Sequence, residues 1–296
     1  MTGTTILDGA MGTALRHRGV PVPDHNTSIW SAWPLLNCPG EVQLLHEDYI
    51  KAGADVITVN DYALTNDSLS KNNLEHQQEK LIKLAVDLAI TARSKQHSSV
   101  RIAGTLPPLR TSFKPELTPK MDTLIAEYRY MADFMVSSVD IFLCETMASI
   151  KEARAAALAA AETGKPVWVS FTLEDQRGNL RSGETIKDAL NGLRQYPIQA
   201  FLVNCSSVAA VKQAMPILQE HSKAQIGAYP NPFLVEPADG IYSQDLPSFL
   251  PPEAFAKEAR NWRELGGTIF GGCCGTNENY VFELRRQFAR ARRDEA

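Results

Sequence analysis

The sequence has no apolar segment long enough to cross a membrane. No run approaches the roughly 18–20 consecutive apolar residues that a bilayer-spanning helix requires. The first residues lead straight into a strand-like segment, without the basic stretch and apolar core that open a secretory signal. The sequence therefore predicts a protein that works in the cytoplasm and has no membrane partner.

Cysteine is scarce and odd in number. The chain of 296 residues has five cysteines, and they do not form the dense pattern of a small disulfide framework. A reducing compartment would keep them available as thiols or thiolates. Cys38 falls in a predicted loop and Cys144 inside a predicted strand, which are ordinary settings for structural cysteines. The other three cysteines have a different setting.

Several common functional signatures are also missing. The net charge of −4 offers no basic patch for nucleic acid, and no GxGxxG fingerprint for a dinucleotide follows any apolar run. The six histidines show neither HxH nor HExxH spacing, so we expect them at the surface or in loops. These absences leave cysteines and carboxylates as the candidates for chemistry.

Eight short apolar runs, rich in β-branched residues, alternate with helical stretches. The runs cover residues 5–7, 55–59, 100–104, 141–144, 166–171, 200–203, 225–229 and 268–271. Continuous apolar runs are typical of parallel strands that are buried on both faces. Helical patterns mark residues 41–52, 79–93, 151–163 and 252–265. We therefore predict an α/β fold, a (β/α)8 TIM barrel forming a single domain over residues 1–296, in preference to a doubly wound sheet.

Polar and cysteine side chains follow the predicted strands. They are Asp8, Asn60, Asp61, Glu145, Asn204, Cys205, Asn231, Cys273 and Cys274. In (β/α)8 barrels the active site lies at the C-terminal ends of the strands. Residues far apart in the sequence are thus expected to converge at one mouth of the barrel.

The adjacent pair Cys273 and Cys274 is the most informative pattern in the chain. It lies in the run Gly-Gly-Cys-Cys-Gly at residues 271–275. A disulfide between neighbours would strain the peptide, whereas a sharp bend, which the glycines permit, turns both thiols toward one soft metal ion. Cys205 follows the predicted strand at 200–203. Three thiolates with an open fourth position predict a catalytic zinc site, and three buried structural thiols are the alternative.

Asp8 and Glu145 are carboxylates at predicted strand ends. Either could act locally instead, Asp8 as a helix N-cap and Glu145 in the first turn of the next helix. As a pair at one mouth they suit the binding of an ammonium group or acid/base chemistry. Gly9 and Gly12 would let the backbone approach a ligand closely. A hydrolase or lyase that uses the two carboxylates, with structural cysteines, is therefore a second hypothesis.

Three motifs in this order resemble the homocysteine S-methyltransferase family. They are the glycine-rich segment at 7–13, Val-Asn-Cys-Ser at 203–206 and Gly-Gly-Cys-Cys-Gly-Thr at 271–276, supported by residues 53–58 and 145–146. The resemblance covers about residues 5 to 280, nearly the whole chain. It implies a zinc-bearing (β/α)8 barrel that transfers a methyl group to the sulfur of homocysteine and gives methionine.

The resemblance also implies roles for single residues. The ligands of Zn²⁺ would be Cys205, Cys273 and Cys274. Two carboxylates would hold the amino group of homocysteine, and the substrate-binding set as a whole would be Asp8, Gly9, Glu145 and Asn204. The implied partners are homocysteine and a small-molecule methyl donor.

The length of the chain limits which methyl donors are expected. The family uses S-methylmethionine, S-adenosylmethionine, betaine or methyl-tetrahydrofolate, and 296 residues leave no room for folate and cobalamin modules beside a barrel. Short members of the family commonly use a sulfonium, so we expect S-methylmethionine or S-adenosylmethionine. The chain departs from the family pattern at residues 59–62 and 232–236. The alternatives are betaine or another donor, a related thiol or selenol acceptor, and a non-catalytic zinc-binding homologue.

Overall fold

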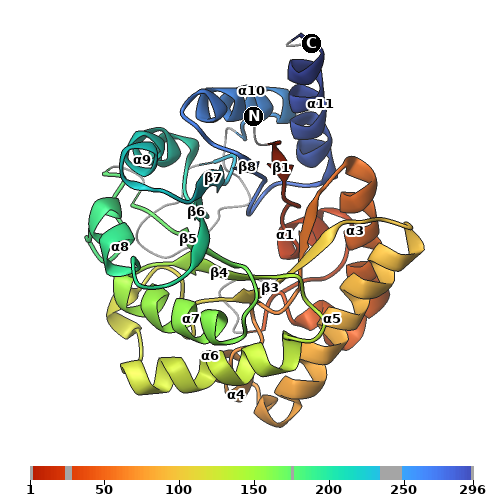
Figure 1. The fold of residues 1–296 in the computed structure, drawn as a ribbon. Helices are drawn as coiled ribbons and strands as arrows, with labels where there is room; N and C mark the ends of the chain where they lie inside the picture. Colours follow the sequence, from red (N-terminus) through yellow and green to blue (C-terminus); the bar gives the residue numbers. More distant parts are fainter. Residues whose placement is uncertain (1–2, 24–28, 175–176, 234–248, 295–296) are drawn as a thin grey trace.

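Eight parallel strands form one sheet that is rolled into a barrel in the computed structural model, which describes residues 3–23, 29–174, 177–233 and 249–294 (Figure 1). The strands are β1 (Thr5–Ile6), β2 (Val56–Thr58), β3 (Arg101–Leu106), β4 (Ile141–Met147), β5 (Val167–Phe171), β6 (Ile198–Asn204), β7 (Gln225–Tyr229) and β8 (Ile269–Phe270). Their order in the sheet is β1-β8-β7-β6-β5-β4-β3-β2. The predicted (β/α)8 barrel is confirmed, and each predicted run coincides with one strand to within a few residues.

Helices form an outer ring around these strands (Figure 1). The helices are α1 (Gly12–His17), α2 (Trp33–Asn37), α3 (Pro39–Ala52), α4 (Asn66–Ser70), α5 (Gln78–Lys95), α6 (Met121–Met135), α7 (Ile150–Glu162), α8 (Ile186–Gly192), α9 (Val208–His221), α10 (Pro252–Glu264) and α11 (Glu278–Asp294), with the 3₁₀ turns η1 (Glu75–Gln77) and η2 (Pro115–Leu117). The four helical patterns of the sequence correspond to α3, α5, α7 and α10. No helix of the described residues combines the length and the apolar character that a membrane crossing demands.

The barrel closes between β1 and β2 through a short seam. The amide of Asp8 donates to the carbonyl of Val56 at 3.1 Å. The carboxylate of Asp55 accepts from the amide of Ile6 at 2.8 Å and forms an ion pair with Arg285 of α11 at 2.5 Å. One carboxylate thus joins the first strand, the start of the second and the last helix. This closure places Asp8 at the rim of the barrel mouth.

Apolar side chains fill both the barrel interior and the layer beneath the helices. Neighbouring residues of β4 point to opposite faces, as residues of a strand do. Leu143 packs inside with Trp168, and Phe142 packs outside in the cluster that includes Trp262. Cys273 packs against the top of the interior cluster. Because the interior is filled, a ligand site must lie at the strand ends.

The expectation that all histidines lie at the surface or in loops is wrong for His46. This residue is completely buried in α3, and its burial lowers the pKa of the imidazole to about 4. The physical reason is helical spacing, because His46 shares the inward face of α3 with Val42, Leu45 and Tyr49. His46 is therefore a neutral core residue.

Candidate active site

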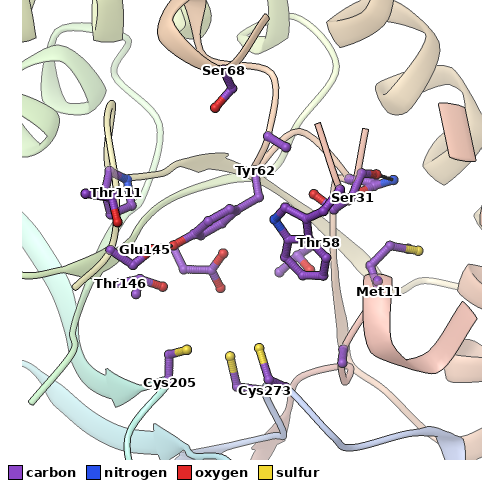
Figure 2. Close-up of a pocket in the computed structure, with 18 of the residues that line it drawn as sticks. Met11, Ser31, Thr58, Tyr62, Ser68, Thr111, Glu145, Thr146, Cys205 and Cys273 are labelled. Atoms are coloured by element: carbon purple, nitrogen blue, oxygen red, sulfur yellow. Dashed lines mark hydrogen bonds between the residues drawn. The ribbon is translucent and has the colours of Figure 1, made fainter. Parts of the chain in front are cut away.

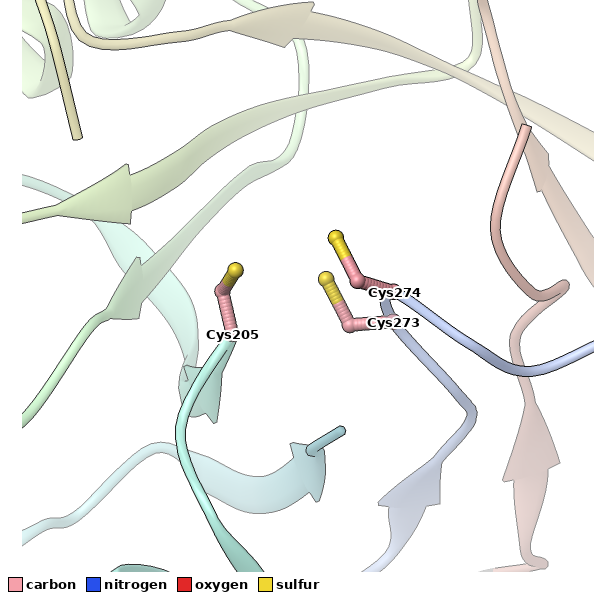
Figure 3. Close-up of side chains that lie close together, drawn as sticks. All are labelled: Cys205, Cys273 and Cys274. Carbon is pink, nitrogen blue, oxygen red and sulfur yellow. The ribbon is translucent and has the colours of Figure 1, made fainter. Parts of the chain in front are cut away.

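Three cysteines from two strand ends point into one small space (Figure 3). Cys205 directly follows β6, and Cys273 and Cys274 follow β8 after two glycines. Their sulfur atoms all lie within 4.8 Å of one another. Zinc–sulfur bonds of about 2.3 Å in a tetrahedron put the sulfurs about 3.8 Å apart. The three thiols therefore fit one tetrahedral metal ion after a small contraction.

The backbone around the cysteines is bent in ways that only a few residues tolerate. Cys205 has a φ of +46°, in the left-handed region that non-glycine residues rarely adopt. Gly275 has a φ of +82°, and a Cβ on Gly272 would lie 2.3 Å from the hydroxyl oxygen of Thr276. Glycine is thus required on both sides of the cysteine pair, as the sequence pattern predicts.

Asn204 contacts the thiol of Cys273 from the end of β6. Its side-chain amide donates to the hydroxyl of Thr146 at 2.8 Å and lies 3.9 Å from the sulfur of Cys273. Its carbonyl oxygen accepts from the amide of Thr146 at 3.1 Å and from the hydroxyl of Ser170 at 2.6 Å. Asn204 is fully buried and does not line the cavity. Its expected place among the substrate-binding residues stays a prediction, and its contacts are those of a support for Cys273.

A second buried amide contacts the third thiol. The side-chain nitrogen of Asn231, just beyond β7, lies 3.9 Å from the sulfur of Cys205 and donates toward it. The sequence places Asn231 at a strand end but gives it no role. Contacts with the thiols of Cys205 and Cys274, followed by burial, raise the pKa of Cys273 well above its ordinary value. A divalent cation among these sulfurs would offset this effect and stabilise the thiolates.

Asp8 faces the cavity from the end of β1. Its carboxylate accepts from the amide of Thr58 at 2.7 Å and from the hydroxyl of the same residue at 3.1 Å. Burial raises the pKa of Asp8 to about 7, and the hydrogen bonds from Thr58 offset only part of that rise. The N-cap interpretation is wrong, because α1 begins at Gly12 with Met11 in the N-cap position.

Glu145 lies inside β4, not after its end as the sequence predicts. The strand continues to Met147 through a register irregularity, and Thr146 takes a φ of +60° there. Such an irregularity re-aims a side chain, and Glu145 points into the cavity above the thiols (Figure 2). The helix-dipole interpretation is wrong, because α7 begins only at Ile150, with Ser149 as its N-cap.

The environment of Glu145 disfavours its charge. Burial raises the pKa of Glu145 to about 8, a hydrogen bond from the hydroxyl of Tyr229 at 3.1 Å lowers it, and the charge of Asp8 raises it further. Neither Glu145 nor Asp8 forms an ion pair with another described residue. A buried and a half-buried carboxyl without a cation form a site that favours a positively charged ligand.

One cavity of about 680 Å³ holds these groups together (Figure 2). Its lining includes all three cysteines and three of the four predicted substrate residues, namely Asp8, Gly9 and Glu145. The predicted close approach of a ligand to the backbone at Gly9 stays a prediction, and the structure adds a second reason for glycine there. A Cβ there would lie 2.9 Å from the hydroxyl of Tyr49, so the missing side chain makes room for the protein itself.

The departure from the family pattern at residues 59–62 has a visible consequence. Asp61 is completely buried, and one of its carboxyl oxygens accepts from the hydroxyl of Thr105. Its other oxygen has no partner among the described residues, and burial raises the pKa of Asp61 to about 7. The neighbouring Tyr62 lines the cavity. In the second departure, at 232–236, residues 234–236 lie outside the described residues.

The fold and the site together define a (β/α)8-barrel enzyme with convergent thiols at its catalytic mouth. The model of the homocysteine S-methyltransferase family matches residues 5–288. The chain therefore belongs to the homocysteine S-methyltransferase family, whose activity is methyl transfer to homocysteine. The resemblance that the sequence motifs indicated, and the methyltransferase class, are confirmed.

Relatives share the length as well as the pattern of this chain. Homocysteine S-methyltransferase YbgG of Bacillus subtilis is 26% identical over 94% of this chain and 92% of its own. Homocysteine S-methyltransferase of Escherichia coli is 28% identical over 95% and 94%. The crystal structure of the homocysteine methyltransferase MmuM from Escherichia coli in a metallated form superposes with a TM-score of 0.79, at 25% identity and 96% coverage of both chains. Its oxidized form gives a TM-score of 0.81.

Proposed function

We propose that this chain catalyses the zinc-dependent transfer of a methyl group from a sulfonium donor, S-methylmethionine or S-adenosylmethionine, to the sulfur of homocysteine. The observation that carries the proposal is the arrangement of one cavity. It combines three thiols within 4.8 Å of one another with two carboxylates, Asp8 buried and Glu145 half-buried, that form no ion pair with another described residue. Family membership supports the acceptor. The products are methionine and the demethylated donor.

The chemistry of the three cysteine ligands fits zinc. Cys205, Cys273 and Cys274 would hold the ion through soft thiolates and leave a fourth position toward the cavity. When bound, zinc would lower the pKa of the substrate thiol, which is about 8.5 in water, and so provide a thiolate at neutral pH. Cytoplasmic location stays a prediction, and a reducing compartment would keep the thiols free for this role.

The carboxylates of Asp8 and Glu145 would bind the ammonium group of homocysteine. An ammonium group between them would stabilise their charged forms and reverse the rise that burial causes in their pKa values. With the amino end fixed, the sulfur of a short side chain points toward the cysteines. Holding the acceptor in one orientation removes much of the entropic barrier to an in-line reaction.

The transfer itself balances without a further reactant. The homocysteine thiol gives up its proton to solvent, and its sulfur forms a bond to the methyl carbon. The bond between that carbon and the donor sulfur breaks, and its electron pair stays on the donor sulfur. The sulfonium thereby becomes a neutral thioether and leaves. The role of the protein is to orient the two sulfurs and to exclude water from between them. Residues 1–296 as a single catalytic domain stay a prediction.

One experiment tests the metal and the reaction together. Wild-type protein, Cys273→Ser and Cys38→Ser are purified under reducing conditions, and each is assayed for zinc and for methionine formed from homocysteine with each candidate donor. Cys38 lies between α2 and α3, away from the cavity lining, so its variant is the matched control. We expect about one zinc per chain and methionine from a sulfonium in the wild type and in the control. Cys273→Ser should lose both.

The possible contrary results are distinct. Wild-type protein without zinc would contradict the metal site. Zinc without methionine from any donor would indicate a non-catalytic homologue. Methionine from betaine alone would keep the acceptor and replace the donor.

A further inference from the structure

The outer part of the cavity carries positive charge. Lys71, which follows α4, lines it together with Arg110 and Lys114 of the segment between β3 and η2. Figure 2 places Ser68 and Thr111, close neighbours of these residues in the chain, on the side of the cavity away from the cysteines. Lys71, Arg110 and Lys114 are exposed, whereas Asp8 and Cys205 are buried, so the cationic side chains lie toward the open end of the cavity.

These cations outnumber their carboxylate partners. Asp67 forms ion pairs with both Lys71, at 2.6 Å, and Arg110, at 2.5 Å. Lys114 forms no ion pair with another described residue. The group thus has two positive charges in excess. Glu127 does not line the cavity, but it lies close enough to Arg110 for that positive charge to lower the pKa of its carboxyl, while burial, the largest cause, and the charge of Asp67 raise it.

The two ends of the cavity therefore have opposite character. Asp8, Glu145 and the three cysteines lie at the inner end, and the excess of positive charge lies at the outer end. Aromatic rings of Trp30 and Tyr62 also line the cavity, as does Phe113, whose ring already has the guanidinium of Arg181 at 4.3 Å from its centroid. Aromatic faces attract onium groups, and a positive methylated atom would be drawn toward the acidic inner end. A molecule that spans the cavity is favoured when its cationic group points inward and an anionic group points outward.

We propose that Arg110 and Lys114 form a carboxylate-binding subsite for the methyl donor, which selects onium compounds that carry a carboxylate. This inference rests on the proposed function for the identity of the donor. A guanidinium group presents several donors in a plane, so Arg110 is able to keep its contact with Asp67 and bind a ligand carboxylate with the remaining N–H groups. Lys114 adds an unpaired ammonium group at the same opening.

Buried hydrogen bonds hold the backbone of the residues that precede Arg110. The amide of Leu109 donates to the buried carboxyl of Glu152 at 3.3 Å, and the hydroxyl of Tyr128 donates to the carbonyl of Pro107 at 3.0 Å. Pro107 and Leu109 are themselves buried. The exposed side chain of Arg110 thus extends from a rigid base, which reduces the entropic cost of holding a ligand.

The experiment compares a donor with its own uncharged ester. Zinc-loaded wild type, Arg110→Gln, Lys114→Gln and the double variant are titrated with S-methylmethionine and with its methyl ester by calorimetry, and steady-state KM values are measured for donor and homocysteine. Arg129→Gln is the matched control, because Arg129 is 51% exposed, as Arg110 is, and pairs with a glutamate on the outer ring.

We expect each single variant to weaken the binding of S-methylmethionine roughly tenfold, and the double variant more. The KM for homocysteine and the zinc content should stay as in the wild type and in Arg129→Gln. Arg110→Lys should retain part of the affinity. The ester should bind the wild type as weakly as S-methylmethionine binds the double variant, and the substitutions should not affect it.

The outcomes separate the subsite from the proposed function. Turnover with S-methylmethionine that is unchanged in the double variant overturns the subsite and leaves the function intact. If the variants bind S-methylmethionine more weakly but no protein forms methionine from it, the subsite is supported and the methyl-transfer proposal is contradicted. Equal binding of the acid and its ester by the wild type overturns the subsite. No calorimetric binding of either also overturns it.

Discussion

The two ends of the cavity are built from different parts of the barrel. At the inner end, Glu145 lies in β4, and Asp8 and the cysteines follow the ends of β1, β6 and β8. At the outer end, Arg110 and Lys114 come from a connecting segment, and their charges are exposed to solvent. Strands position the inner groups rigidly, whereas connecting segments carry the groups that vary with the ligand.

Burial separates the two ends energetically as well. It raises the pKa values of Asp8 and Glu145 to about 7 and about 8, because the protein interior disfavours an unpaired charge. The ion pairs of Arg110 and Lys71 with Asp67 have exposed cationic side chains, so they contribute little to stability. A substitution at the inner end should therefore affect the metal or the binding of homocysteine, according to the group that it removes. One at the outer end should affect the donor alone.

The largest effect is expected for Asn204→Ala. The substitution leaves the amide of Thr146 and the hydroxyl of Ser170 without their partner, which costs about 1–3 kcal/mol of stability. It also removes the support of Cys273, so we expect zinc affinity to fall about 10- to 100-fold. Urea unfolding and competition with a chelator measure the two effects. Asn261→Ala, on the exposed face of α10, is the control.

An Asn204→Ala protein with wild-type zinc affinity would show that the thiols need no support from β6. The amide would then serve folding only.

The next effect is expected for Glu145→Gln. The amide keeps the contact with Tyr229 but removes one of the two negative charges at the inner end. We expect the KM for homocysteine to rise tenfold or more, because a charge-assisted contact is replaced by a neutral one, while zinc content and donor KM stay unchanged. Glu79→Gln, an exposed residue of α5, is the control. A loss of zinc in Glu145→Gln would contradict the assigned role.

A third test uses pH to examine the buried charge of Asp61. Because its folded pKa is raised from 3.8 to about 7, the native state disfavours ionisation, and stability falls as the pH rises toward 7. Between pH 5 and pH 8, the metal-free wild type should lose on the order of 2–3 kcal/mol more of its free energy of unfolding than metal-free Asp61→Asn loses. Urea midpoints at both pH values measure this loss. Asp133→Asn, an exposed residue of α6, should leave the pH dependence as it is.

The smallest effect is expected at the outer end. Tyr128→Phe removes the hydroxyl that donates to the carbonyl of Pro107, at a cost of about 1 kcal/mol. We expect the donor KM to rise a few fold, because the base of Arg110 becomes looser, and the homocysteine KM to stay constant. Tyr130→Phe, which lies in the same helix and is 43% exposed, is the control. A matching change in the homocysteine KM would indicate that the two ends are not independent.

The sequence predicts the inner end far better than the outer end. Cys205, Cys273 and Cys274 are identifiable because apolar runs mark the strand ends and glycines mark the sharp turn. The extension of β4 past Glu145 is not predictable, because a register irregularity depends on neighbouring strands and has no local pattern. Arg110 has no signal either, since a single arginine in a connecting segment resembles any solvated charge.

The position of the three thiols across the sheet also affects the conformational entropy of the unfolded chain. Cys205 follows β6 and the cysteine pair follows β8, so the ligands flank β7. A metal held by them would act as a cross-link that closes a long loop of chain, including β7 and α10. Such a closure reduces the conformational freedom of the unfolded chain and joins strands that do not pair directly. Removal of the metal should therefore lower the unfolding temperature of the barrel even when no substrate is present.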